Sequence, residues 1–150
     1  MQQDIERDLK TALLSGNKEL VETLKSLKSA LQYEAVALKT RPEELDKTQI
    51  QNVFAREAKK RQEAITMYRS AGETERANKE EREKNVIDDY LPTQMSEDEI
   101  RSLVAAEIDS IDAPSMKDMG KIIGSVKAKA GAGADGSLIA GIVKTELGNI

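Results

Sequence analysis

The chain has 150 residues, of which 23 are Lys or Arg and 27 are Asp or Glu, so its formal net charge is -4. It contains no Cys, His or Trp, which excludes a disulfide framework, a Cys- or His-ligated zinc site and a Ser-His-Asp triad. No apolar run approaches the roughly 20 residues needed to cross a bilayer. We therefore expect a cytoplasmic protein without a membrane span, a bound metal or another cofactor.

Apolar residues recur at steps of three and four along most of the chain, a pattern that is typical of amphipathic helices. One helix is expected before Gly16, and the clearest stripe follows over residues 20–38. That helix ends before Pro42, because a residue that precedes proline avoids helical angles. Further helices are predicted over residues 43–69 and roughly 74–90. The clearest stripe consists of Leu20, Leu24, Leu27, Leu31, Ala35 and Leu38.

Three more helices are expected after Pro92, each with its own start signal. Ser96 and Glu99 stand at the spacing of a capping box, in which each side chain accepts a hydrogen bond from the other residue's amide. Ser115 begins the second of these helices, and Asp135 is a candidate N-cap for the last. The predicted apolar stripe of the second helix consists of Met116, Met119, Ile123 and Val126.

No segment alternates with the period of a strand, so the sequence predicts an all-α protein in two domains. Residues 1–92 are expected to form a helical bundle with long helices, and residues 93–150 a small three-helix domain. Net charge is -1 over residues 1–92, -5 over residues 93–112 and +2 over residues 113–150. An acidic chain of this kind can present a basic surface near its end.

Arg61 lies on the apolar stripe of the helix predicted over residues 43–69, and so does Glu57, one turn before it. A charge on a core face is costly unless it is paired. Glu34 falls at the edge of the apolar face of the preceding helix. We therefore expect a structural ion pair in which Arg61 bridges Glu57 and Glu34. The alternatives are a polar ligand site and an arginine that reaches water over a shallow stripe.

Gly120 and Gly124 stand four residues apart in a predicted helix and leave a strip of bare backbone. A glycine inside a helix costs up to about 1 kcal/mol relative to alanine, so two of them call for a reason. One reason is the close approach of a neighbouring helix. The other is the close approach of a nucleic-acid backbone whose phosphates bind nearby lysines. The candidate RNA-binding residues are Lys117, Gly120, Lys121, Gly124, Lys127 and Lys129.

No catalytic constellation is visible in the sequence. Gly120-Lys121 is not part of a P-loop, because Ser115 and Ile122 occupy the places where that motif needs a glycine and a Ser or Thr. We assign no catalytic, cofactor-binding or metal-ligating residue.

Five segments follow one another along the chain: Ser29-Ala30-Leu31-Gln32-Tyr33-Glu34, Glu57-Ala58-Lys59-Lys60-Arg61-Gln62-Glu63-Ala64-Ile65, Tyr90-Leu91-Pro92, Met119-Gly120-Lys121 and Ala134-Asp135-Gly136. In this order they resemble the GatB/YqeY family over nearly the whole chain. Each segment alone is a weak signal, whereas the ordered set is a strong one. The proteins of this family are small, stand-alone and bacterial, and they are similar to the tail of the B subunit of the glutamyl/aspartyl-tRNA amidotransferase.

The resemblance implies an all-α fold and a link to tRNA-dependent amidation, a carbon–nitrogen ligase reaction with glutamine as amido-N-donor. In the amidotransferase the similar tail helps to hold tRNA, away from the chemistry. The positions that match the tail here are Met119-Gly120-Lys121 and Ala134-Asp135-Gly136. One departure is Ala132-Gly133-Ala134, where the family often has a basic residue.

The resemblance does not imply catalysis by this chain alone, because the chain lacks the kinase-like body of the B subunit and the serine-rich motif of the amidase subunit. We therefore expect a non-catalytic tRNA-binding or amidation accessory module, with an amidotransferase or another protein as a possible partner. One alternative is an interaction module that docks a partner helix on the Gly120/Gly124 strip. Another is an enzyme, or a subunit of one, in glutamine-dependent amidation.

Overall fold

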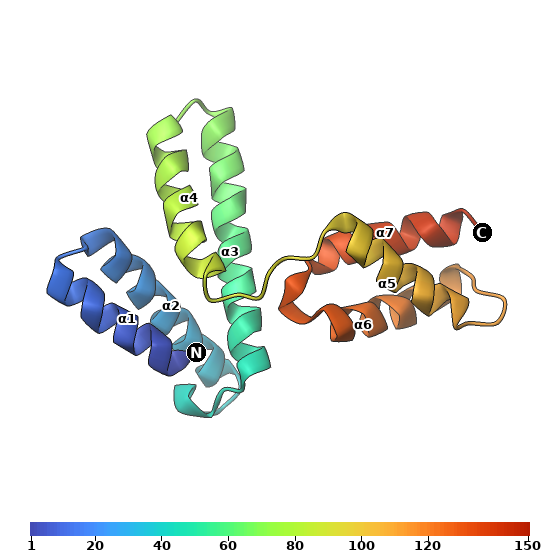
Figure 1. Cartoon of the computed structure of the whole chain (residues 1–150), viewed down its shortest axis with the longest axis horizontal. Coiled ribbons are helices and arrows are strands. Elements are labelled where there is room, and N and C mark those ends of the chain that lie inside the picture. The colour runs from blue at the N-terminus through green and yellow to red at the C-terminus, as the bar shows by residue number, and fades with distance from the viewer. The chain divides into compact units, whose positions relative to one another are not determined.

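The computed structural model describes residues 1–150, which form seven α-helices and no strand (Figure 1). The prediction of an all-α protein is confirmed. The helices fall into two compact units, Met1–Leu91 and Pro92–Ile150. The α-helices are α1 (Gln2–Ser15), α2 (Lys18–Ala37), α3 (Lys47–Ser70), α4 (Thr74–Asp88), α5 (Glu97–Asp109), α6 (Met119–Ala130) and α7 (Gly136–Gly148). The short 3-10 helices are η1 (Pro42–Glu44), η2 (Met116–Asp118) and η3 (Gly131–Gly133).

The first unit consists of two helical hairpins, α1–α2 and α3–α4 (Figure 1). Gly16 closes α1 in the left-handed conformation, with φ of 71°, which glycine adopts without steric strain. Gly72 has φ of 75° in the connection between α3 and α4. The third helix begins at Lys47 rather than at residue 43, because the chain first turns through η1 and Asp46 then caps α3. The two hairpins therefore have well-defined ends.

The hairpins share one apolar core, in which Phe54 of α3 is fully buried. The ring of Tyr90 meets Phe54 edge to face, with 6.0 Å between the ring centroids. Tyr90 also donates a hydrogen bond from its hydroxyl to the carboxylate of Asp8 in α1. Tyr90 therefore ties the end of the second hairpin to the first.

In the second unit, α5, α6 and α7 enclose a separate core. The capping box at Ser96 is present: Ser96 donates its amide to Glu99 at 2.7 Å, and the Glu99 amide donates to the Ser96 hydroxyl at 3.2 Å. The Met95 amide donates to the Gly133 carbonyl at 2.7 Å, which fastens the segment before α5 to η3. The buried core residues are Ile100, Val104, Ile122, Val126, Ile139, Ile142, Val143 and Leu147.

The apolar stripe predicted for α6 is wrong at Met116 and omits Ile122. Met116 is 48% exposed and Ile122 is buried in the core, whereas Met119 and Ile123 are partly buried against it. The reason for the error at Met116 is that this residue belongs to η2, where each residue advances by about 120° rather than 100°. A stripe drawn through a single α-helix therefore does not extend back to Met116. None of the seven helices combines the length and apolar character that a membrane crossing requires.

Candidate nucleic-acid interface

The two glycines of α6 lie on its exposed face. A Cβ atom added to Gly120 or to Gly124 would meet no heavy atom within 4 Å outside the helix's own backbone. Packing against another helix of the same chain therefore does not account for these glycines. The bare backbone is open to a second molecule.

Lys117 and Lys121 flank this bare backbone, and both are exposed. Neither side chain forms an ion pair or a hydrogen bond within the chain. We call Lys117 of η2 together with Gly120, Lys121 and Gly124 of α6 the α6 strip. It combines accessible backbone with two cationic groups that are available to an external anion.

Lys127 is placed differently, because its side chain lies over the start of α7. A Cβ atom on Gly136 would stand 3.2 Å from the Lys127 ammonium and 3.3 Å from its Cε. Glycine at position 136 therefore leaves room for this lysine. Asp135 caps α7 by accepting a hydrogen bond from the Ser137 amide at 2.8 Å. This amide at the start of α7 therefore already has an anionic partner. The structure thus brings the last turns of α6 together with the Ala134-Asp135-Gly136 segment.

Lys129 is engaged within the chain. Its ammonium donates to Glu107 of α5, and the Ser125 hydroxyl donates to the other oxygen of that carboxylate at 2.8 Å. The hydrogen bonds from Lys129 and Ser125 hold the pKa of Glu107 below its usual range, and Lys121 adds a weaker attraction. Sequence reasoning missed Glu107, since its position relative to α6 depends on how α5 packs.

The structure gives Arg61 different partners from those expected. Arg61 binds Glu80 at 3.2 Å and Glu83 at 2.8 Å, both on α4. The expected partners are already occupied: Glu57 pairs with Lys60 at 2.8 Å, and Glu34 pairs with Arg56. The reason is that α4 runs antiparallel to α3 and covers its apolar face. This packing places Glu80 and Glu83 of α4 next to Arg61.

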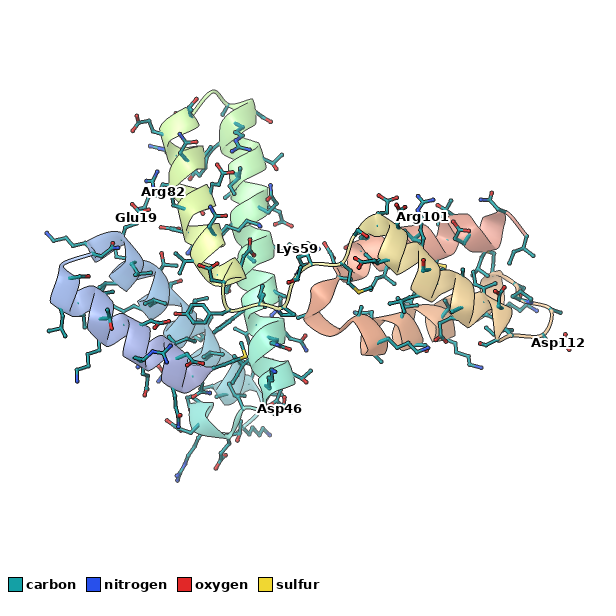
Figure 2. All side chains as sticks on the ribbon, in the orientation of Figure 1. Glu19, Asp46, Lys59, Arg82, Arg101 and Asp112 are labelled. Carbon is teal, nitrogen blue, oxygen red and sulfur yellow. The ribbon has the colours of Figure 1, made fainter.

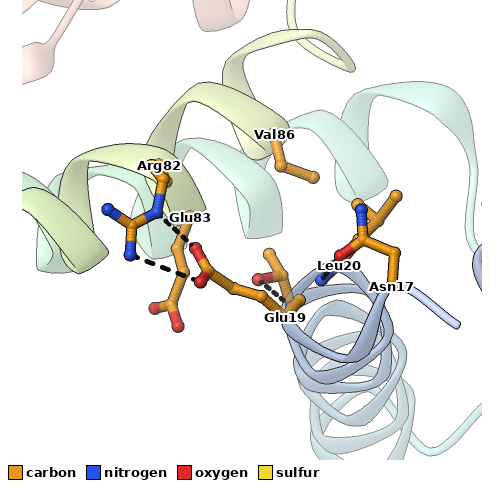
Figure 3. A pocket seen from close by; sticks show the side chains of 7 residues that line it. Asn17, Glu19, Leu20, Arg82, Glu83 and Val86 are labelled. Carbon is orange, nitrogen blue, oxygen red and sulfur yellow. Dashed lines mark hydrogen bonds and ion pairs between the residues drawn. The ribbon is translucent and has the colours of Figure 1, made fainter.

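A cavity of about 330 Å³ lies in the first unit, between the start of α2 and α4 (Figure 3). Arg82 donates to both carboxylate oxygens of Glu19, at 2.7 and 3.3 Å, along its edge. These charges neutralise each other, and Leu20 and Val86 supply apolar surface. The cavity holds no nucleophile paired with a base.

Charged side chains project from the helices of both units (Figure 2). Most of them form surface ion pairs, such as Arg101 with Glu97 at 2.6 Å. Nowhere do three or more acidic side chains gather closely enough to hold a metal ion. The exposed pairs contribute little to stability individually. Lys117 and Lys121 of the α6 strip are among the exposed lysines that form no ion pair.

The fold defines a small all-α protein with two compact helical units. The sequence matches the family described as Yqey-like protein over residues 2–147, and the chain belongs to that family. The family expected from the sequence is thereby confirmed. Comparison with curated proteins finds no match.

Proposed function

We propose that the chain is a non-catalytic tRNA-binding module that acts in the cytoplasm as an accessory to glutamine-dependent tRNA amidation. Its RNA-binding surface is the α6 strip. The observation that carries this proposal is the open backbone at Gly120 and Gly124, flanked by two exposed lysines that form no ion pair or hydrogen bond within the chain.

Structured RNA is recognised largely through its shape and its sugar–phosphate backbone, because side chains cannot read its deep, narrow major groove. A surface without side chains at two successive helical turns lets such a backbone come close to α6. Lys117 and Lys121 then stand beside it as phosphate ligands. Aromatic residues for stacking on single-stranded bases are absent from the strip, which favours a structured RNA.

Long-range attraction does not drive this binding, because residues 93–150 contain 9 acidic and only 6 basic residues. Binding depends instead on where Lys117 and Lys121 lie. Each phosphate contact contributes about 0.7 to 0.9 to the slope of log affinity against log salt concentration. We therefore expect a slope of roughly 1.4 to 1.8 for two lysines.

The test is a titration of the full chain with bulk tRNA over a series of salt concentrations. Changing Lys117 and Lys121 to Glu should abolish binding without a change in the helical circular dichroism spectrum. The matched control changes Lys10 and Lys25, which are exposed and unpaired in the first unit, to Glu. This control alters net charge by the same amount and should retain binding.

Equal loss in both double variants would show that net charge, not the α6 strip, determines affinity. If the unaltered chain binds no tRNA even at low salt, the tRNA proposal fails. A partner helix docked on the bare backbone would then be the explanation to test.

A further inference from the structure

We propose that Ser125 and Lys129 form an oxyanion site on α6 that Glu107 fills in the free protein, and that an RNA phosphate replaces Glu107 there on binding. This inference rests on the proposed function. It adds a regulatory contact: the chain carries its own competitor for the RNA backbone.

The geometry of the site comes from two packed helices. Glu107 reaches across from α5 and accepts the Ser125 hydroxyl at 2.8 Å on one oxygen and the Lys129 ammonium on the other. The Glu107 side chain is only 15% exposed, whereas that of Lys129 is 55% exposed. The carboxylate is therefore held in place, while the lysine that holds it is accessible from outside.

The site lies next to the α6 strip. Lys121, Ser125 and Lys129 follow one another at four-residue steps, so they form one line along the helix surface. The line spans about 12 Å along the helix axis. A nucleic-acid backbone that binds Lys121 is thus directed along the helix toward Ser125 and Lys129.

A phosphate can take the place of the carboxylate because both are oxyanions that accept charge-assisted hydrogen bonds from an ammonium and a hydroxyl. Glu107 opposes RNA in two ways. Its charge repels an approaching phosphate, and its bonds to Ser125 and Lys129 must break before these groups bind RNA. Weak polyanions are thereby excluded, while an RNA that contacts the whole line displaces the carboxylate.

The test compares Glu107→Gln with Asp109→Asn in the full chain. Asp109 is exposed on the same helix and forms no ion pair, so its change removes the same charge without opening the site. Glu107→Gln should raise tRNA affinity about tenfold at low salt, because no carboxylate has to be displaced from Ser125 and Lys129, while the salt slope stays close to that of the unaltered chain since the phosphate contacts are the same. Asp109→Asn should leave the affinity close to that of the unaltered chain.

Lys129→Ala in the Glu107→Gln background should remove the gain. Should Glu107→Gln fail to fold, Ser125→Ala with Lys129→Ala in the natural background tests the same site, and an unchanged tRNA affinity there overturns the inference. If the unaltered chain binds tRNA and Glu107→Gln behaves like Asp109→Asn, this inference is wrong and the proposed function stands. If neither the unaltered chain nor Glu107→Gln binds tRNA, both fall.

Discussion

The guanidinium of Arg61 lies 2.8 Å from the carboxylate of Glu83, a side chain that is only 8% exposed. The same guanidinium nitrogen lies 3.2 Å from Glu80. These contacts cross the interface between α3 and α4, where the other inward-facing side chains include Ile65 and Ala77. Burial raises the pKa of Glu83 even though Arg61 opposes the shift. The ion pair with Arg61 is therefore the main interaction that stabilises the ionised carboxylate of Glu83 in an otherwise apolar interface.

Replacing Arg61 by Ala should destabilise the first unit. The change leaves Glu83 buried, with Lys79 at 3.9 Å as its remaining cation. Leaving a buried polar group without its partner costs about 1–3 kcal/mol, and more for a charged one. We expect a loss in that range, measured as the free energy of unfolding in urea at neutral pH.

Arg69→Ala is the matched control for this prediction. Arg69 joins the same two helices by pairing with Glu81 at 2.8 Å, but both side chains are about half exposed. Exposed pairs contribute about 0–1 kcal/mol, so this variant should unfold close to the unaltered chain. Equal effects of the two substitutions would mean that Arg61 and Glu83 are not desolvated in solution.

Replacing Glu83 by Gln should change how stability depends on pH. The pKa of Glu83 is raised above 4.5, chiefly by burial, so the folded state takes up a proton at higher pH than the unfolded state does. As pH falls from 7 to about 4.5, ionised Glu83 is neutralised first in the folded state, and the free energy of unfolding gains a favourable contribution. Glu83→Gln lacks this contribution.

The measurement for Glu83 is the difference in unfolding free energy between the unaltered chain and Glu83→Gln, at several pH values between 7 and 4.5. Other carboxylates titrate in both proteins and cancel in the difference. This difference should shift in favour of the unaltered chain as pH decreases. A constant difference would show that Glu83 keeps an ordinary pKa in the folded protein.

The outcome at Arg61 shows what periodicity can and cannot predict. A helical wheel places Arg61 on an apolar face, and that placement alone requires a partner. It describes one helix at a time, however, so the choice of Glu80 and Glu83 depends on α4 packing antiparallel to α3. The same limit hides Glu107, which meets Lys129 only because α5 packs against α6.

Most of the α6 strip could be predicted from the sequence. Gly120, Lys121 and Gly124 could be placed on a common face from their spacing, because they lie within one continuous helix, whereas Lys117 belongs to η2. Met116 could not be placed this way, because η2 changes the rotation per residue just before α6 begins. The direction of Lys127 also depends on tertiary structure, since it follows from the position of Gly136 in the next helix.

Tyr90→Phe should weaken the contact between the two hairpins. It removes the hydrogen bond to Asp8 but keeps the ring that packs against Phe54. The free energy of unfolding should fall by about 1.5 kcal/mol, which is more than for a bond between neutral groups because the acceptor is charged. Tyr33→Phe is the control, since Tyr33 is 78% exposed and should change stability very little. Equal stability of both variants would contradict the Asp8 contact.

Replacing Gly120 and Gly124 together by Ala should stabilise the second unit and at the same time weaken tRNA binding. Both glycines lie inside α6, and an added Cβ atom meets nothing within 4 Å. Alanine should therefore stabilise the helix by up to about 1 kcal/mol at each position. The same two methyl groups cover the backbone that we propose an RNA approaches.

Thermal unfolding and tRNA titration of this double variant separate the two effects. Gly131→Ala is the control for stability, because its φ of 56° disfavours any residue with a Cβ atom, and it should lower the melting temperature. A rise in melting temperature with unchanged tRNA affinity would show that RNA does not approach the backbone of α6. A rise accompanied by weaker binding would mean that the two glycines are kept at the expense of stability because a ligand needs the space.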